Sequence, residues 1–236
     1  MIIMRNSGHS DLGDVGDLGK AGLDREVVDR LLTTTRAVRK RIDLDRPVEP
    51  EVVLECLQLA SQAPSGGNTQ RWRWMIVADA EKKKVVARFY ADSFARYIAP
   101  KRAALQPDDA AGHRMIESAT YLADRMADMP LLVIPCTLDT LAPDANAEQR
   151  AGLYGGIFPA VWSFQLALRS RGLGSALTTL HLDYEREIGD ALGIPETVTQ
   201  VALLPVGYYT GDDFRPAARR PVSQITYWDT WKAVRS

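Results

Sequence analysis

Apolar residues spaced three and four positions apart predict helices, and short continuous apolar runs predict buried strands. The spacing predicts helices at about 24–34, 50–60, 82–97, 114–129, 148–170 and 184–192. The continuous runs predict strands at about 72–78, 131–138, 174–180 and 201–207. Helices and strands in this order predict an α+β fold, in which helices cover both faces of a small mixed sheet.

Glycine and proline mark the ends of these elements. Pro50 suits the first turn of its helix, and Gly172 is expected to end the 148–170 helix as its C-terminal cap. Pro100 is expected to interrupt the charged helix before it, and Pro159 to kink the 148–170 helix or to mark its true start. That helix is apolar on almost every side, so it is expected to be buried, either in the core or at a subunit interface.

The two ends of the chain differ from its middle. Residues 1–21 are rich in glycine, aspartate and serine and lack the apolar core of a signal peptide, which predicts a flexible leader. Residues 208–236 are polar with late aromatic side chains, and are expected to form an arm that lies against another surface. No linker or repeat divides the rest, so residues 22–236 are expected to form a single domain.

Composition narrows the classes of function. The formal net charge of −1 argues against a general affinity for nucleic acids or membrane surfaces. The sequence contains no run of about 18 apolar residues, so no membrane-spanning helix is expected. Cys56 and Cys136 are expected to be buried thiols, as in a protein of the reducing cytoplasm. The histidines are scattered, so no metal site of standard spacing is expected, and His181 is interpreted as structural.

The most informative segment joins the second helix to the first strand. It reads Ala-Pro-Ser-Gly-Gly-Asn-Thr-Gln over residues 63–70. Its two glycines permit positive φ and close approach of a ligand. Ser65, Asn68 and Gln70 offer hydrogen-bond donors and acceptors. The combination suits a flat cofactor rich in heteroatoms, although a plain helix-to-strand turn also accounts for the proline and glycines.

Two basic segments are candidates for binding an anion. Arg36 and Arg39 follow the first helix three residues apart and can converge on one phosphate, with roughly 1.5–3 kcal/mol for each charge-assisted bond. A second cluster, Arg215 with Arg219 and Arg220, lies near the end of the chain. Taken alone, each segment is better explained as an exposed basic surface, the first one favoured by the helix dipole.

Several familiar catalytic signatures are absent from the sequence. There is no Gly-x-Gly-x-x-Gly after a strand, no P-loop and no Gly-x-Ser-x-Gly. The carboxylates are plentiful but mark no obvious acid/base pair. The interpretation therefore depends on the motifs that are present and on their order.

Taken in order, these motifs resemble the FMN-dependent nitroreductase family. They are Thr-Arg-Ala-Val-Arg at 35–39, the 63–70 segment before a strand that starts with Trp72, Leu-Arg-Ser-Arg-Gly-Leu-Gly-Ser at 168–175, Thr178-Thr179 and Gly-Ile-Pro at 193–195. The resemblance covers about residues 31–231. The sequence of residues 33–48 and 158–162 is most similar to mycobacterial and other actinobacterial NAD(P)H nitroreductases of the NfnB type.

The resemblance implies a nitroreductase-like fold and an intertwined homodimer with two FMN sites, each built from both chains. The residues implied to bind FMN are Arg36, Ala37, Arg39, Pro64, Ser65, Gly66, Asn68, Leu177, Thr178, Thr179, Arg219 and Arg220. The arginine segments are implied to hold the phosphate and pyrimidine side, residues 64–68 to line the flavin from the other subunit, and residues 177–179 to run beside N5. Thr179 is the candidate for a hydrogen bond at N5, no other catalytic residue is assigned, and the C-terminal arm is implied to wrap the partner.

The implied activity is a ping-pong oxidoreductase reaction. A hydride passes from NADPH or NADH through flavin N5 to a nitroaromatic, a quinone or a similar flat acceptor, and the cofactor carries this chemistry. A flavin-destroying or dehalogenating member of the same fold, or a non-catalytic FMN-binding protein, remains an open alternative. The sequence does not determine the acceptor, and only the basic lid segment at 89–115 favours NADPH. The lid residues expected either to contact substrate or a nucleotide 2′-phosphate, or to lie on an exposed amphipathic helix and loop, are Tyr90, Phe94, Arg96, Tyr97, Lys101 and Arg102.

Overall fold

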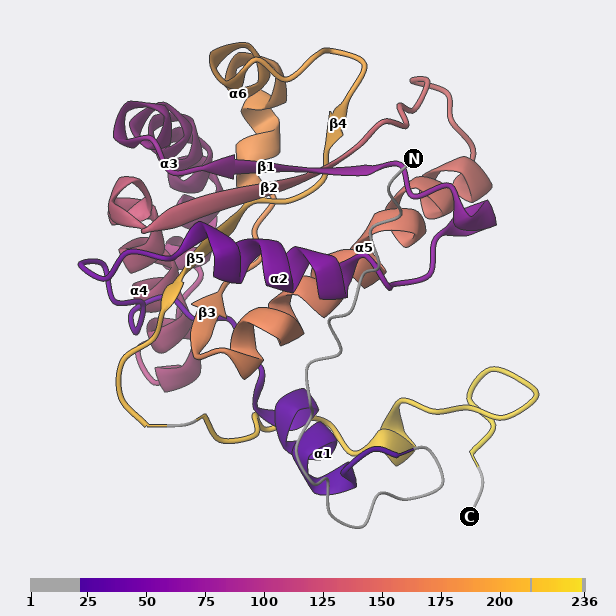
Figure 1. Ribbon diagram of the computed structural model, residues 1–236. Coiled ribbons are helices and arrows are strands. Elements are labelled where there is room, and N and C mark those ends of the chain that lie inside the picture. Colours follow the sequence, from indigo (N-terminus) through magenta and orange to yellow (C-terminus); the bar gives the residue numbers. More distant parts are fainter. Residues whose placement is uncertain (1–21, 213, 235–236) are drawn as a thin grey trace. The chain divides into compact units, whose positions relative to one another are not determined.

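A computed structural model describes residues 22–212 and 214–234 of the chain (Figure 1). They belong to two compact units. The larger unit, Thr35–Arg215, contains the sheet and most of the helices. The other unit combines the two ends of the chain, and its described part contains α1 (Arg25–Thr34) and the short 3-10 helix η4 (Val222–Gln224). The predicted leader at 1–21 lies outside the described residues.

The larger unit alternates helices with short strands. Its helices are α2 (Pro50–Ala60), α3 (Ala80–Ala103), α4 (Ala110–Asp124), α5 (Ala147–Ser170) and α6 (Glu185–Leu192), with 3-10 helices η1 (Gly66–Asn68), η2 (Met126–Asp128) and η3 (Leu180–Tyr184). Its strands are β1 (Trp72–Val77), β2 (Leu131–Thr137), β3 (Leu173–Ser175), β4 (Thr199–Gln200) and β5 (Leu204–Tyr208). The strand order is β1-β2-β5-β3, with β4 paired to β2.

The sheet is small and almost wholly antiparallel. All the strand ladders are antiparallel, from the β1–β2 pair to the β3–β5 pair. Among the described residues, the parallel pairing is an isolated bridge between Ala37 and Ser175. The sheet is therefore mixed, as predicted, only through this bridge.

Strand β2 divides the larger unit into two cores. Leu132 and Ile134 pack among residues of α3, α4 and α6, whereas Leu131 and Val133 pack among residues of α2 and α5. Because successive side chains of a strand point to opposite faces, helices cover the sheet on both sides. In Figure 1, α2 and α5 lie together on one of these faces. The predicted buried strand and the predicted layers are confirmed.

Helices α3 and α5 continue through prolines that were expected to interrupt them. Pro100 lies in the last turn of α3 and Pro159 lies inside α5. A proline removes one backbone donor, but the buried residues after Pro159, such as Ala160 and Phe164, hold the second half of α5 in the core. Tertiary packing therefore outweighs the local cost.

Helix α5 is long and apolar enough to cross a membrane by length and composition, the one such helix among the described residues. Core helices of other proteins pass the same test, and 44% of the apolar window is buried inside the protein. Burial is not complete, however, because Trp162 is 44% exposed. The face of α5 that contacts the sheet and α2 is buried in the core, and burial of the rest at a subunit interface stays a prediction.

The strand expected at 174–180 is shorter than predicted. Strand β3 ends at Ser175, and Thr178 returns to the sheet through one isolated bridge to Leu203 before η3 begins at Leu180.

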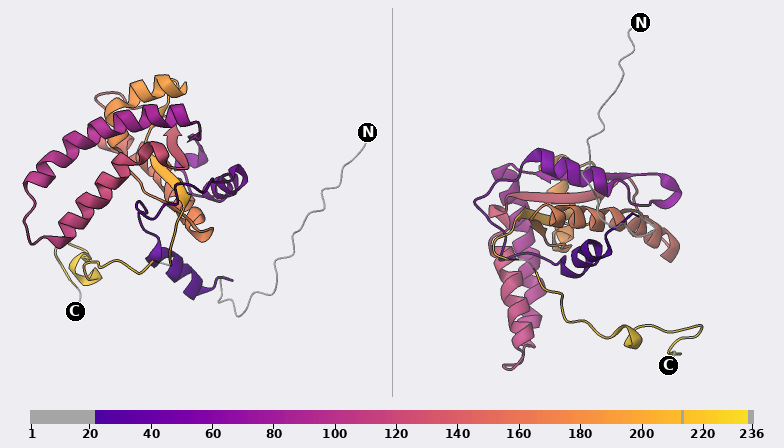
Figure 2. Two further views of the ribbon diagram at one scale, coloured as in Figure 1. Left: turned by 90° about the vertical axis from the view of Figure 1, so that its left-hand side faces the viewer. Right: turned by 60° about the horizontal axis from the view of Figure 1, so that its bottom comes forward.

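Helix α4 begins earlier than predicted, at Ala110 rather than near 114, because the Asp109 carboxylate accepts the Gly112 backbone N–H at 2.8 Å. In both views of Figure 2, α3 and α4 run side by side and meet at their connecting loop.

Candidate functional site

The loop at 63–70 has an unusual backbone. Three of its residues have left-handed φ values, +56° at Gly67, +52° at Asn68 and +47° at Gln70. Positive φ was expected of both glycines, but of these only Gly67 has it, while two residues with side chains adopt this costly conformation. The loop stabilises itself, because Gln70 donates its backbone N–H to Ser65 Oγ at 3.3 Å and its amide to Asn68 Oδ1 at 3.0 Å.

The same loop borders a pocket of about 350 Å³. The other walls are the end of β2, the chain at 139–145 and the first turns of α5. Gly152 and Gly156 of α5 face this pocket one helical turn apart, so backbone is accessible there. A Cβ atom built on Gly66 would meet nothing within 4 Å. The loop therefore borders open space, and the flat cofactor expected beside it stays a prediction.

A second group of predicted residues meets at the opposite edge of the sheet. The bridge between Ala37 and Ser175 places the basic segment against β3, and Val38 donates its N–H to the Ser175 carbonyl at 2.8 Å. A Cβ atom built on Gly174 would lie 2.6 Å from the Val38 Cβ, so this approach requires glycine. Ser175 is buried, and its Oγ accepts the Gln165 amide of α5 at 3.0 Å.

The residues after β3 form the edge of this second group. Thr178 exchanges two backbone hydrogen bonds with Leu203, at 3.0 and 2.8 Å, which fixes its position. Its neighbours Leu177 and Thr179 are exposed. The predicted trio at 177–179 thus lies directly beside the segment that carries Arg36, Ala37 and Arg39.

Tyr90 of α3 also belongs to this group. It is only 3% exposed, and its hydroxyl lies 3.3 Å from Thr178 Oγ1. Burial raises the pKa of the phenol, while the Thr178 hydrogen bond and the nearby positive charge of Arg39 oppose the rise. The expectation that Tyr90 lies on an exposed face is wrong, because the α3 face that carries it packs into the core, and a contact with substrate stays a prediction.

The predicted arginines are placed differently from one another. Arg39 is half-buried, and its guanidinium makes no hydrogen bond or ion pair with any described residue. Arg36 is exposed and donates Nη1 to the Arg215 carbonyl at 3.3 Å. Arg219 and Arg220 are exposed residues of the other unit, and their phosphate contact remains a prediction. Arg39 is therefore the cation most available to an anion beside 177–179.

The two groups of predicted residues are far apart on one chain. Gly152 of α5 lines the pocket beside the 63–70 loop, whereas Gln165 of α5 bonds Ser175. These two positions are thirteen residues apart, which is about 20 Å along an α-helix. A single tricyclic ring does not span that separation.

Arg96, the other lid residue, is already occupied. Its guanidinium contacts Asp92 and donates to Asp183 Oδ2 and the Tyr184 hydroxyl, both at 3.2 Å. The Tyr184 hydrogen bond and then Arg96 lower the pKa of the Asp92 carboxyl. This network joins α3 to η3, so Arg96 fixes the lid helix instead of presenting a charge to a nucleotide phosphate.

His181 and the two cysteines lie inside the protein. Neither imidazole nitrogen of His181 has a hydrogen-bond partner among the described residues, and burial lowers its pKa to about 3. Burial raises the pKa of Cys56 to about 11 and that of Cys136 to about 12, so both thiols stay protonated at neutral pH. These residues are buried as predicted, and none is poised for chemistry.

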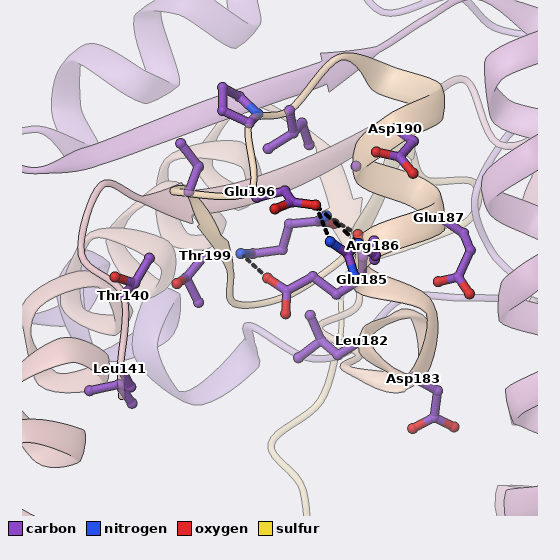
Figure 3. A pocket seen from close by; sticks show the side chains of 15 residues that line it. Thr140, Leu141, Leu182, Asp183, Glu185, Arg186, Glu187, Asp190, Glu196 and Thr199 are labelled. Carbon is purple, nitrogen blue, oxygen red and sulfur yellow. Dashed lines mark hydrogen bonds and ion pairs between the residues drawn. The ribbon is translucent and has the colours of Figure 1, made fainter. Parts of the chain in front are cut away.

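A larger pocket of about 550 Å³ lies elsewhere, between α6, β4 and the chain near Leu141 (Figure 3). All its charged lining residues but one are acidic, and the exception, Arg186, pairs with Glu196. Glu185 accepts the Gln200 backbone N–H at 2.7 Å. The pocket contains none of the predicted site residues, and the described chain has no group of three or more potential metal ligands.

The roles of two contributors to the site were missed: Gln165 was not singled out in the sequence, and Tyr90 was expected only as a lid residue. Tyr90 and Gln165 lie on helices whose register against the sheet determines what they touch. The one available signal for Gln165 was a glutamine among apolar residues on α5, because a buried amide needs partners. No local signal distinguished Tyr90 from its neighbours.

Comparison with known proteins identifies the family. A family model described as Nitroreductase family matches residues 32–208, three quarters of the chain. The chain belongs to the nitroreductase family. The chain is 31% identical over 212 residues to the 5,6-dimethylbenzimidazole synthase of Rhodospirillum rubrum. This alignment covers 85% of this chain and 87% of the relative.

Solved structures confirm the nitroreductase-like fold. Oxidized iodotyrosine deiodinase bound to FMN and 3-iodo-L-tyrosine superposes with a TM-score of 0.65 at 24% identity, covering 85% of this chain and 98% of the other. The FMN- and NADPH-dependent nitroreductase NfnB from sphigopyxis sp. strain HMH has a TM-score of 0.63 at 19% identity, covering 86% and 99%. These comparisons do not show a particular closeness to the NfnB type within the nitroreductase family.

Proposed function

We propose that this protein is an FMN-dependent oxidoreductase that passes a hydride from NADPH or NADH to a nitroaromatic, quinone or similar flat acceptor. The observation that carries the proposal is the Ala37–Ser175 bridge, because it brings the half-buried, unpaired Arg39 beside residues 177–179. Family membership supports a flavin at this place. Bound FMN would supply the hydride-transfer chemistry, so no side-chain nucleophile is needed.

The residues present fit FMN in charge and in shape. Arg39 and Arg36 offer guanidinium groups suited to bidentate phosphate bonds, and Arg219 with Arg220 would complete the clamp. The exposed Ala37 backbone and residues 177–179 would flank the ring. Open space at Gly66 leaves room for a flat system above the loop. The chain itself binds and orients; Thr179 is the candidate hydrogen-bond partner near N5.

A homodimer completes the proposed site. The 20 Å between the two groups along α5 favours a loop, Pro64–Asn68, that serves the site of the other chain. Apolar side chains on α2 and α5 support such an interface, with Leu54 63% and Trp162 44% exposed. The C-terminal arm, whose Trp231 is 80% exposed, would wrap the partner as part of a 22–236 domain. Two free, buried cysteines fit a cytoplasmic protein.

A flavin-destroying activity is the second candidate. Its support is the 31% identity to 5,6-dimethylbenzimidazole synthase over most of both chains. A dehalogenase is supported more weakly, since the deiodinase structure at 24% identity shares the fold. Oxygen-dependent loss of the flavin spectrum with a benzimidazole product would favour the second candidate over the first.

The test is to purify the protein, titrate it with FMN and follow anaerobic reduction by NADPH and NADH in a stopped-flow instrument. We expect tight FMN binding, rapid bleaching and reoxidation by nitroaromatics or quinones. Arg39→Ala should weaken FMN binding at least tenfold, as expected for one lost charge-assisted bond. Arg125→Ala, which removes a surface pair with Asp128, is the matched control. A protein that binds no FMN would contradict the proposal.

A further inference from the structure

Helix α3 is fastened to the chain that follows Thr178. The rings of Phe89 and Tyr184 lie 4.9 Å apart, and the Tyr184 hydroxyl donates to the Asp92 carboxylate. Arg96 adds its bond to Asp183 one turn further along α3. Side chains on this stretch of α3 are therefore held in a fixed place relative to residues 178–184.

Tyr90 lies in the middle of this fastened stretch. Its ring stacks on Phe94 at 6.3 Å and is buried in the core, so the hydroxyl has little freedom. That hydroxyl meets Thr178 Oγ1 at 3.3 Å. The Thr178 backbone is itself held on both sides by Leu203. What remains to be set at Thr178 is the direction of its hydroxyl proton.

The chemistry of the two hydroxyls decides which one donates. Burial raises the pKa of Tyr90, so the phenol keeps its proton at neutral pH. A phenol is a stronger acid than an aliphatic alcohol and therefore the better donor. Thr178 Oγ1 then accepts, and its own proton points away from Tyr90. The 3.3 Å separation is longer than the usual O–H···O distance. An acceptor that receives the Thr178 proton would polarise the Thr178 hydroxyl and strengthen its hydrogen bond from Tyr90.

We propose that Tyr90 is a positioning residue that aims the Thr178 hydroxyl proton at the flavin edge. This inference rests on the proposed FMN site beside 177–179, in which Thr179 is the candidate near N5, and adds to it Tyr90 from the buried face of α3. Tyr90 would not touch the flavin; it sets the donor direction of Thr178, which would flank the ring next to Thr179.

The test compares Tyr90→Phe with wild type in FMN affinity, midpoint potential, visible spectrum and the rate of anaerobic flavin reduction. Tyr90→Phe should keep FMN affinity within twofold but slow reduction about tenfold, because the donor is misaligned. The two-electron potential should fall by about 30 mV, the equivalent of a tenfold change. Tyr208→Phe, on β5, loses a 2.7 Å hydroxyl bond to Glu49; it is the matched control and should behave as wild type.

A double-mutant cycle separates positioning from a general structural role. In a Thr178→Val background, Tyr90→Phe should produce no further loss of rate or potential, because its effect passes through the Thr178 hydroxyl. A second tenfold loss in that background would overturn the inference. Wild-type behaviour of Tyr90→Phe would overturn it while leaving the FMN proposal intact. A wild-type protein without FMN would overturn both.

Discussion

The two halves of the proposed site are built by opposite means. The half at Ala37 and Ser175 to Thr179, here named the core-side half, is held by backbone bonds to the sheet and by the buried side chains of Tyr90 and Gln165. The loop half at 64–70 is exposed and bonded mainly to itself, with three residues in left-handed conformation. Left-handed conformations of residues other than glycine cost energy, and they cluster at functional sites.

The difference suggests a division of labour. The core-side half cannot move without disturbing the sheet, so it suits the fixed placement of a cofactor. The loop half borders a pocket together with the first turns of α5 and suits contact with a second chain. Variants that damage the core-side half should therefore lower the stability of the fold. Variants that damage the loop half should weaken FMN binding alone.

A matched pair of glycines should show the largest contrast. Gly174→Ala places a Cβ 2.6 Å from the Val38 Cβ, so it should separate Ala37 from β3, lower the free energy of unfolding by about 1–3 kcal/mol and abolish FMN binding. Gly66→Ala meets nothing within 4 Å and should change the free energy of unfolding by less than about 0.5 kcal/mol. Urea denaturation checks both. Equal effects would remove the contrast between the halves.

The pH dependence of stability should reveal His181, which directly follows the core-side half. Burial lowers its pKa to about 3 in the folded protein, whereas the ordinary pKa is near 6.5. Between these two pH values the unfolded chain therefore binds a proton that the folded protein does not. Stability should fall as pH drops from 6.5 towards 3, by about 2 kcal/mol at pH 5 from this residue.

His181→Leu should remove that loss, because leucine carries no proton. The comparison is urea denaturation of both proteins at pH 7 and pH 5, at one protein concentration. Parallel losses in the two proteins would show that the imidazole is protonated, or accessible to water, in the folded state.

The smallest effect on stability is expected in the loop half. Ser65→Ala removes a long, exposed 3.3 Å bond to the Gln70 N–H, so the free energy of unfolding should change by less than about 0.5 kcal/mol. FMN affinity should nevertheless fall about three- to tenfold, the value of one neutral hydrogen bond. A Ser65→Ala variant that unfolds early but binds FMN normally would assign the loop a structural role.

Features set by neighbouring residues could be predicted from the sequence. Asp24 caps α1 by accepting the Val27 N–H at 3.1 Å, and the apolar run of β2 is buried throughout. Gly172 has φ of +75° where α5 ends, as its capping position requires. The order of motifs also led to the family. Each of these signals is local, and here the tertiary contacts agree with it.

Features set by tertiary contacts could not be predicted in this way. Nothing in the sequence placed Tyr90 against Thr178, because that meeting depends on the register of α3 on the sheet. The 174–180 run reads as one strand, yet the ladder ends at Ser175 because Thr178 pairs with a different segment, at Leu203. Asparagine tolerates a left-handed φ such as that of Asn68, but nothing in the residue type predicted the same conformation at Gln70.

The central claim is that each site takes its core-side half from one chain and its loop half from the other. Two variants test it together: Arg39→Glu in the core-side half, and Gly66→Trp in the loop half, where the new side chain would fill open space. Each homodimer alone should lack FMN. Differently tagged chains are co-expressed and purified as heterodimers, and FMN per dimer is measured from the visible spectrum. The account predicts one FMN per heterodimer, because both lesions fall in one site; a heterodimer without FMN would contradict it.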